Sequence, residues 1–248
     1  MIRVRGLKKR LGARQVLDGV DFDVEAGETV VVMGRSGSGK SVLLKHIIGL
    51  MTPDEGSIEV EGQEIVGMGE QELDAVRRRF GMLFQSAALF DSLTVGDNVG
   101  LGLREHLRLD DVEVRRRVAE RLEWVGLAAV EAMKPASLSG GMRKRVGLAR
   151  AIAMDPQYIL YDEPTTGLDP IMADAIDQLI RSLQKRLGVT SIVVTHDMTS
   201  AYKVADRMVM LHEGRMVFSG TPDETRASTD PVVRQFVQGS SIGPIRPL

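Results

Sequence analysis

Residues 34–41 combine glycines with a lysine and a hydroxyl in a spacing that suits the binding of phosphate. They read Gly34, Arg35, Ser36, Gly37, Ser38, Gly39, Lys40 and Ser41. Glycines let several backbone N–H groups approach a polyphosphate at once, because they lack Cβ and tolerate positive φ. The pattern GxxxxGK[ST] puts Lys40 at the β- and γ-phosphates and Ser41 on Mg²⁺. The motif therefore predicts a P-loop with ATP and Mg²⁺ as its ligands.

Two acidic residues stand at the end of an apolar run, where Asp162 and Glu163 follow residues 158–161. In P-loop enzymes an Asp in this position holds Mg²⁺. The Glu beside it can polarise the attacking water. The alternative is a strand that runs into a polar turn, with which Pro164 is compatible. The P-loop upstream favours the chemical interpretation.

A histidine closes another apolar run, since His196 follows residues 191–195. Ligands of α/β sheets gather at the carboxyl ends of the strands. We therefore expect His196 to lie near the phosphates. An isolated histidine is more often an ordinary surface or core residue, and we assign His46, His106 and His212 to that class.

The elements that must position these groups alternate between strands and helices. Residues 29–33 form a continuous apolar strand that enters the P-loop, and residues 39–49 have apolar side chains at helical spacing. Strands and helices alternate again over residues 158–211. This alternation predicts an α/β fold with a mostly parallel sheet, preceded by an N-terminal antiparallel β portion.

The middle of the chain is largely helical, which indicates an insertion into this sheet. We predict one domain with its core at residues 1–85 and 156–239 and a helical subdomain at about residues 86–155. The short C-terminal tail, residues 240–248, is poor in core residues, and we expect it to pack loosely.

Composition limits the cellular context. The formal net charge is −2, so the chain as a whole has no excess of positive charge that would attract nucleic acid. The sequence contains no cysteine, so disulfide bonds are excluded. No apolar run approaches the roughly 18 residues of a membrane span, and the first residues lack the apolar segment of a signal peptide. We expect a protein that reaches the membrane only through a partner.

Further motifs resemble those of the ATP-binding-cassette (ABC) ATPases, and the resemblance covers nearly the whole chain. The signature motif of this family is matched by residues 138–142, which read Leu138, Ser139, Gly140, Gly141 and Met142. The resemblance implies an ABC-type fold and a homodimer, because the signature of one copy binds the γ-phosphate of the nucleotide held by the other. It also implies roles for Gln85 as the Q-loop residue, which contacts Mg²⁺ or water, Asp169 as the D-loop residue, Glu163 as the catalytic base and His196 as the switch histidine.

Two positions depart from the family pattern. Met142 stands where most members have Gln. Leu11 stands before Gly12, where members usually offer an aromatic ring to adenine. Leucine can cover adenine by apolar contact but lacks the aromatic contribution of roughly 0.5–1.5 kcal/mol.

A finer resemblance is to the Mla/MCE-associated phospholipid-transport ATPases. It rests on the Met-ending signature and on short matches at residues 83–90, 103–106 and 230–237. It implies a homodimer on the cytoplasmic face of the inner membrane that energises an integral-membrane permease. An MCE-domain lipid-binding protein and, in some members, a STAS-domain subunit complete such systems. The C-terminal extension of this group can cross the dimer, but here only residues 240–248 follow Gly239.

Arginine clusters at residues 77–79, 115–117 and 143–145 raise the question of nucleic acid. We interpret them as solvated helix faces, because acidic residues elsewhere balance their charge and no aromatic residues interleave with them. The alternatives to lipid transport are an ABC ATPase for another transported substrate and a soluble ABC ATPase of translation or DNA repair. The single cassette and the lack of long heptad runs disfavour the soluble class.

Overall fold

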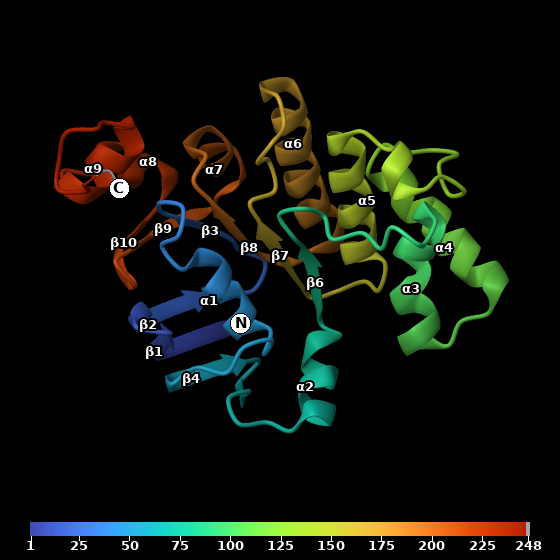
Figure 1. The fold of residues 1–248 in the computed structure, drawn as a ribbon, viewed down its shortest axis with the longest axis horizontal. Coiled ribbons are helices and arrows are strands. Elements are labelled where there is room, and N and C mark those ends of the chain that lie inside the picture. Colours follow the sequence, from blue (N-terminus) through green and yellow to red (C-terminus); the bar gives the residue numbers. More distant parts are fainter. Residues whose placement is uncertain (247–248) are drawn as a thin grey trace. The chain divides into compact units, whose positions relative to one another are not determined.

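The structure is a computed structural model that describes residues 1–246 (Figure 1). The chain divides into two compact units. Unit 1 comprises Met1–Arg77 together with the chain from Thr190, and unit 2 comprises Arg78–Val189. The predicted helical subdomain, residues 86–155, lies inside unit 2. Within residues 1–246 no helix is long and apolar enough to cross a membrane.

Unit 1 contains an antiparallel sheet in the order β2-β1-β4-β5. Its strands are β1 (Ile2–Leu11), β2 (Arg14–Val24), β4 (Glu55–Val60) and β5 (Gln63–Glu64). Alternating side chains of β1 and β2 are buried, as expected for strands with one face on a core. The predicted N-terminal antiparallel portion is therefore present.

A second group of strands in unit 1 carries the P-loop. The strand β3 (Thr29–Met33) pairs in parallel with β8 (Thr190–Thr195) on one side and β9 (Arg207–His212) on the other, and β9 pairs antiparallel with β10 (Arg215–Gly220). Every residue of β3 and β8 is buried, which explains why both read as continuous apolar runs. The helices of unit 1 are α1 (Lys40–Ile47), α2 (Glu70–Arg77), α7 (Met198–Val204), α8 (Pro222–Ala227) and α9 (Pro231–Gln238).

Unit 2 is mostly helical. It contains the parallel pair β6 (Phe80–Leu83) and β7 (Tyr158–Asp162) with the helices α3 (Val95–Leu107), α4 (Asp111–Trp124), α5 (Gly140–Ile152) and α6 (Pro170–Leu187), and a 3₁₀ turn at Pro135–Ser137. Side-chain oxygens of Thr94, Asp110 and Asp169 accept hydrogen bonds from the first backbone N–H groups of α3, α4 and α6. Local capping thus sets where these helices begin.

The C-terminal tail is better ordered than we expected. The Gln235 side chain binds both backbone groups of Ile245: the Ile245 N–H donates to Oε1 at 2.6 Å, and Nε2 donates to the carbonyl oxygen at 2.8 Å. Ile245 is buried, whereas residues 240–244 and 246 are exposed, so the expectation of loose packing is wrong for Ile245 alone. An amide side chain replaces the apolar contacts that the tail lacks. Residues 247–248 of the predicted tail lie outside the described residues.

Candidate nucleotide-binding and hydrolysis site

The P-loop joins the end of β3 to the start of α1, and its glycines are required there. Gly34 has φ 156°, and a Cβ on it would overlap the carbonyl oxygen of Leu211. Gly39 has φ 103°, and its Cβ would lie 3.0 Å from the carbonyl oxygen of Val16. Side chains at these positions would force the loop away from its supporting strands. The glycines therefore keep a backbone cradle of the kind that polyphosphates need.

Lys40, the first residue of α1, is held along this loop. Its Nζ donates to the carbonyl oxygens of Gly34 at 2.8 Å and Arg35 at 3.0 Å. The side chain is 5% exposed. The ammonium thus lies beside the cradle with its long side chain already ordered, which lowers the entropic cost of contacting a phosphate.

The hairpin between β1 and β2 supports the P-loop through a residue that the sequence did not point to. Leu11 pairs with Arg14 in this hairpin, and Arg14 Nη2 donates to the carbonyl oxygen of Gly37 at 2.9 Å. Leu11 is 42% exposed. The pairing puts Leu11 on the turn that touches the P-loop, where a purine ring could rest on its side chain. The sequence offered one signal for Arg14: it lies three residues after Leu11, across the turn from the expected adenine-binding position.

Substitution of Leu11 by tyrosine should tighten the binding of ATP. An added ring that stacks on adenine contributes roughly 0.5–1.5 kcal/mol, which corresponds to about a 2- to 10-fold lower Kd. Calorimetric titration in a Glu163→Gln background measures this without turnover. Leu107→Tyr, at an exposed leucine of unit 2, is the control and should leave the Kd unchanged. Equal affinity of Leu11→Tyr and its parent would mean that another residue covers the base.

His196 lies at the strand end next to the P-loop, as predicted. The register pairs Met33 of β3 with Thr195 of β8, so the P-loop and His196 follow neighbouring strand ends. Arg35, Ser36 and His196 line one pocket of about 410 Å³ with the tail. Arg35 Nη1 also donates to the carbonyl oxygen of Arg246 at 2.7 Å, so the tail contacts the P-loop of its own chain.

In unit 2, the acidic pair lies at the end of β7, and both side chains are buried. Glu163 has φ 49°, in the left-handed region that a non-glycine residue occupies only where its surroundings hold it. The Thr166 hydroxyl donates to Glu163 Oε2 at 3.1 Å and orients the carboxylate. Lys144 of α5 donates to the backbone carbonyl oxygens of Gln85, at 2.5 Å, and Glu163, at 3.0 Å. The Q-loop and the predicted base thus share one lysine.

The signature segment begins α5. The Ser139 hydroxyl caps this helix by accepting from the Met142 N–H at 3.2 Å, and both Ser139 and Gly140 are exposed. A Cβ on Gly141 would overlap Cε of Met172 in α6, so a larger residue here would require the end of this flexible side chain to move. Asp169 caps α6 by accepting from the backbone N–H groups of its first turn. The segment presents a helix N-terminus with exposed small residues, which suits an anion.

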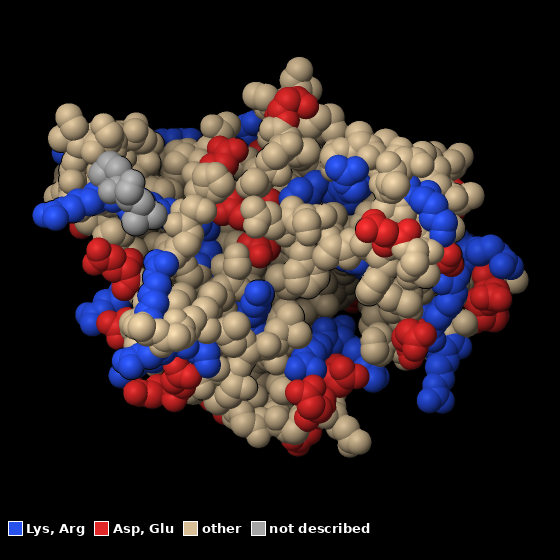
Figure 2. Space-filling view, viewed as in Figure 1, with Lys and Arg blue, Asp and Glu red and all other residues tan. Residues whose placement is uncertain are grey.

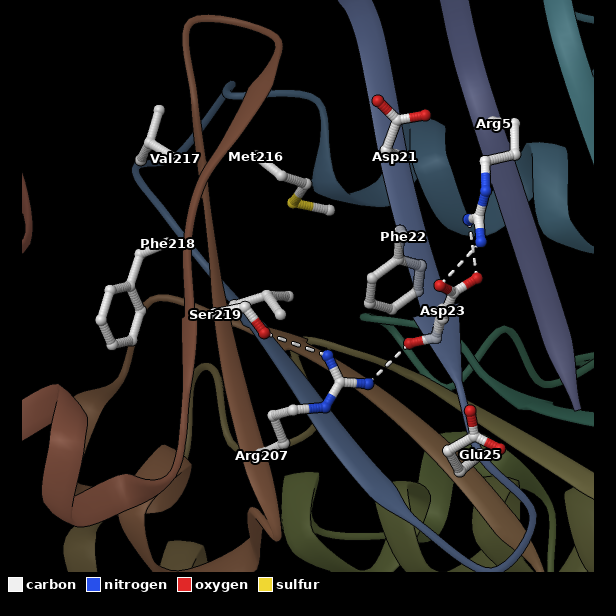
Figure 3. A pocket seen from close by; sticks show the side chains of 11 residues that line it. Arg5, Asp21, Phe22, Asp23, Glu25, Arg207, Met216, Val217, Phe218 and Ser219 are labelled. Atoms are coloured by element: carbon white, nitrogen blue, oxygen red, sulfur yellow. Dashed lines mark hydrogen bonds and ion pairs between the residues drawn. The ribbon is translucent and has the colours of Figure 1, made fainter.

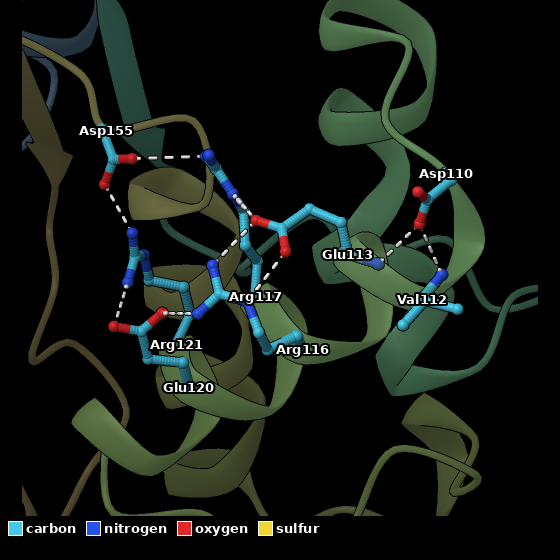
Figure 4. A network of polar contacts seen from close by, with 8 residues as sticks. All are labelled: Asp110, Val112, Glu113, Arg116, Arg117, Glu120, Arg121 and Asp155. Carbon is cyan, nitrogen blue, oxygen red and sulfur yellow. Dashed lines mark hydrogen bonds and ion pairs between the residues drawn. The ribbon is translucent and has the colours of Figure 1, made fainter.

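The arginine clusters agree with the interpretation as solvated helix faces at residues 115–117 but not at Lys144. Arg116 and Arg117 donate to Glu113 at 2.7–2.9 Å (Figure 4). The hydrogen bonds from Arg116, and then those from Arg117, lower the pKa of the Glu113 carboxyl to about 2. On the face drawn in Figure 2, basic side chains likewise alternate with acidic ones. The interpretation as solvated faces is wrong for Lys144, which is 5% exposed, because two carbonyl acceptors compensate its burial.

Arg121, one helical turn beyond these arginines, is also buried. Its side chain is 6% exposed, and its Nη2 contacts Asp155 at 2.6 Å. The guanidinium groups of Arg121 and Arg186 stack on Trp124, with 3.9 and 4.0 Å from each Cζ to the ring centroid. These contacts give the arginines of this region a structural role in joining α4 to its neighbours.

A larger hollow of about 600 Å³ lies between β2 and β10 in unit 1 (Figure 3). Arg5 forms an ion pair with Asp23, and Arg207 donates to the carbonyl oxygen of Asp23 at 2.6 Å and to the Ser219 hydroxyl at 3.2 Å. These polar groups bind one another across the hollow. Its chemistry is therefore that of a structural junction between the two sheets.

Comparison with known proteins agrees with this geometry. A family model described as ABC transporter matches residues 17–166. The probable ribonucleotide transport ATP-binding protein mkl of Mycobacterium leprae is 45% identical over 244 residues, which are 98% of this chain and 70% of that protein. The intermembrane phospholipid transport system ATP-binding protein MlaF of Haemophilus influenzae is 42% identical over 246 residues, 99% of this chain and 93% of that protein.

A solved structure gives the same result for the fold. The dimeric ATP-binding cassette MJ0796, in a post-hydrolysis state bound to ADP and Pi, superposes with a TM-score of 0.83 at 34% identity, covering 90% of this chain and 99% of that one. The predicted ABC-type fold and the family resemblance are confirmed. The chain belongs to the ABC transporter family, as an ATP-hydrolysing subunit.

Proposed function

We propose that residues 34–41 hold the phosphates of ATP, that Glu163 is the general base and that His196 contacts the γ-phosphate. The glycine cradle, the ordered Lys40 and the His196 position beside Arg35 and Ser36 support the binding half of this proposal. The buried, hydrogen-bonded Glu163 supports the other half, since a base must be held in one orientation to activate water.

The proposed metal ligands fit Mg²⁺ in their chemistry. Ser41 offers a hydroxyl, Asp162 a carboxylate and Gln85 an amide oxygen. Mg²⁺ prefers such hard oxygen ligands and keeps several waters, so few protein ligands are enough. Bound Mg²⁺ would neutralise charge that develops on the β- and γ-phosphates.

We further propose that two copies pair, so that Ser139, Gly140 and Gly141 of one copy bind the ATP held by the P-loop of the other, with Asp169 near the same interface. The exposed signature at the start of α5 supports this pairing, because its backbone N–H groups are available to a phosphate from outside. The similar cassette MJ0796 is dimeric.

The transported substrate that we propose is phospholipid. The observation that carries this proposal is the MlaF match, which spans 99% of this chain and 93% of that phospholipid transport subunit. In such a system the chain acts at the cytoplasmic face of the inner membrane, bound to an integral-membrane permease. An MCE-domain lipid-binding protein and a STAS-domain subunit are the further proposed partners.

The name of the M. leprae relative, a probable ribonucleotide transport ATP-binding protein, favours ribonucleotide as the competing substrate. The two substrates are distinguished by tagging this chain, purifying it from detergent-solubilised membranes with its partners and measuring ATP hydrolysis in lipid nanodiscs. Stimulation by added phospholipid, with co-purification of an MCE-domain protein, is expected. Stimulation by ribonucleotides in the absence of such a protein would replace the lipid proposal. Recovery without any membrane protein would favour a soluble ABC ATPase.

The permease is proposed to dock beside the Q-loop, at residues 85–90. Phe90 is 52% exposed, although its backbone is fixed by Asn98, whose Oδ1 accepts from the Phe90 N–H at 2.8 Å and whose Nδ2 donates to the carbonyl oxygen at 3.1 Å. An exposed ring on a rigid backbone costs little entropy to bind. Ala87, by contrast, is buried, so the apolar surface offered here is that of Phe90 with the half-buried Leu89.

Substitution of Phe90 by serine should leave melting and basal hydrolysis near those of the parent and abolish co-purification with the permease. The ring contributes little to the folded unit because half of its surface is already in water. Val112→Ser, at a residue of α4 that is 70% exposed, is the matched control and should keep the permease. Early melting of Phe90→Ser with the permease still bound would assign the ring to the core of unit 2.

A further inference from the structure

The helix that carries the signature also contacts the Q-loop and the predicted base. Lys144 lies one turn beyond the signature glycines in α5, and its Nζ joins the carbonyl oxygens of Gln85 and Glu163 at 2.5 and 3.0 Å. Neither carbonyl belongs to a helix or strand, so each needs a donor from outside such an element. The Glu163 carbonyl also accepts from the Thr166 N–H at 3.3 Å, and the buried Lys144 ammonium donates to both carbonyls.

The backbone at Glu163 needs such support. With φ 49°, it occupies a region that L-residues with a Cβ rarely adopt. The direction of the carboxylate is tied to that backbone through Thr166, whose hydroxyl donates to Oε2 at 3.1 Å and whose N–H donates to the Glu163 carbonyl oxygen at 3.3 Å. A donor fixed on the Glu163 carbonyl therefore also fixes where the carboxylate points.

A second cation of α5 holds the next part of the Q-loop. Ala87 and Ala88 have φ values of 63° and 45°, and Arg150 donates to both carbonyl oxygens at 2.7 Å. Gly147 lets the helix approach closely, since its Cβ would lie 3.1 Å from that of Ala87. The Q-loop backbone is thus bound to α5 at two places.

An ammonium is the donor at the first of these places. A charged donor makes a stronger hydrogen bond to a carbonyl than a neutral one does. The same ammonium is attracted to the acidic end of β7, which adds to its hold on Glu163.

We propose that Lys144 is a positioning residue for ATP hydrolysis: it transmits the conformation of the Q-loop backbone to Glu163, so that the base is aligned only when the Q-loop is in place. The proposal rests on the role of Glu163 proposed above. Lys144 acts through Glu163 and touches no reacting atom.

Lys144→Met removes the donor and keeps the apolar stem. The expected result is a fall in kcat of about tenfold or more, with the Kd for ATP within about twofold of the parent, because the P-loop that holds the phosphates keeps its own contacts. Lys144→Gln replaces the ammonium by a shorter, uncharged amide donor. It carries the test if the Met variant does not fold, and a smaller fall in kcat is expected for it, again with little change in the Kd for ATP. Arg145→Met is the control on the same helix: Arg145 donates to the carbonyl oxygen of Val125 at 3.1 Å, and its loss should leave kcat near normal.

A double-mutant cycle with Glu163→Gln separates positioning from general damage. If Lys144 acts through Glu163, adding Lys144→Met to Glu163→Gln should lower the residual single-turnover rate by less than about twofold, and ATP should still induce the dimer in size exclusion. A kcat of Lys144→Met near that of the parent would overturn the proposal. Full multiplication of the two losses, or loss of the ATP-induced dimer, would overturn it too. Normal turnover of Glu163→Gln alone would instead refute the proposed base.

Discussion

Replacement of Lys40 by alanine is expected to abolish ATP hydrolysis and to weaken ATP binding by about 30-fold or more. The ammonium is already ordered by the carbonyl oxygens of Gly34 and Arg35, so its charge is available to the phosphates at little entropic cost. Loss of one partner from a buried, hydrogen-bonded charge pair typically costs about 2–5 kcal/mol. Steady-state hydrolysis and calorimetric titration with ATP measure the two effects.

The matched control for this experiment is Lys45→Ala. Lys45 belongs to the same helix, but it is exposed in the last turn of α1 and lies away from the loop. Its substitution should leave both hydrolysis and affinity near normal. Hydrolysis by Lys40→Ala above about a tenth of the parent rate would contradict the assignment, because a lost charge clamp does not permit it. Melting curves of both variants show whether α1 remains folded.

The local structure around the P-loop could be predicted because short-range rules determine it. The buried strand before it consists of β-branched residues and methionine, and Gly34 and Gly39 stand where the backbone has positive φ. The apolar run and the glycine positions can both be recognised from a few neighbouring residues of the sequence. The helix begins at Lys40, within a residue of the predicted start.

The supporting contacts could not be predicted in the same way, because they join residues far apart in the sequence. Arg14 binds the carbonyl of Gly37, 23 positions away, and Lys144 binds that of Gln85, 59 positions away. A lysine or arginine in a charged run is usually solvated, so the place of Lys144 in the run 143–145 predicted a side chain exposed to solvent. Backbone carbonyls in loops give no signal of their own in a sequence.

Helical periodicity did contain a signal for Lys144. Gly141, Lys144 and Leu148 follow one another at spacings of three and four residues, and all are buried in α5. A lysine on the apolar stripe of a helix must find acceptors or remain at the edge of the stripe. The sequence therefore marked the position as unusual, while only the fold identifies Gln85 and Glu163 as its acceptors.

The second large effect is expected for Glu163→Gln, which should stop turnover and leave ATP binding intact. Glutamine keeps the shape of the side chain, and its Oε1 can still accept from the Thr166 hydroxyl. It loses the basic oxygen that takes a proton from the attacking water, a contribution of about 100- to 10,000-fold to the rate. With hydrolysis blocked, ATP remains bound by the P-loop of one copy and the signature of the other, so the dimer should accumulate.

Size exclusion with and without ATP tests this expectation, together with single-turnover hydrolysis. Glu123→Gln, at an exposed glutamate of α4, is the control and should turn over normally without accumulating a dimer. A dimer that forms with ATP but not with ADP would link its stability to the γ-phosphate, the group that only the intact nucleotide offers to Ser139 and Gly140. Normal turnover of Glu163→Gln would mean that another group is the base. A variant that does not hydrolyse ATP and stays monomeric with ATP would contradict the proposal that the signature of one copy binds the nucleotide of the other.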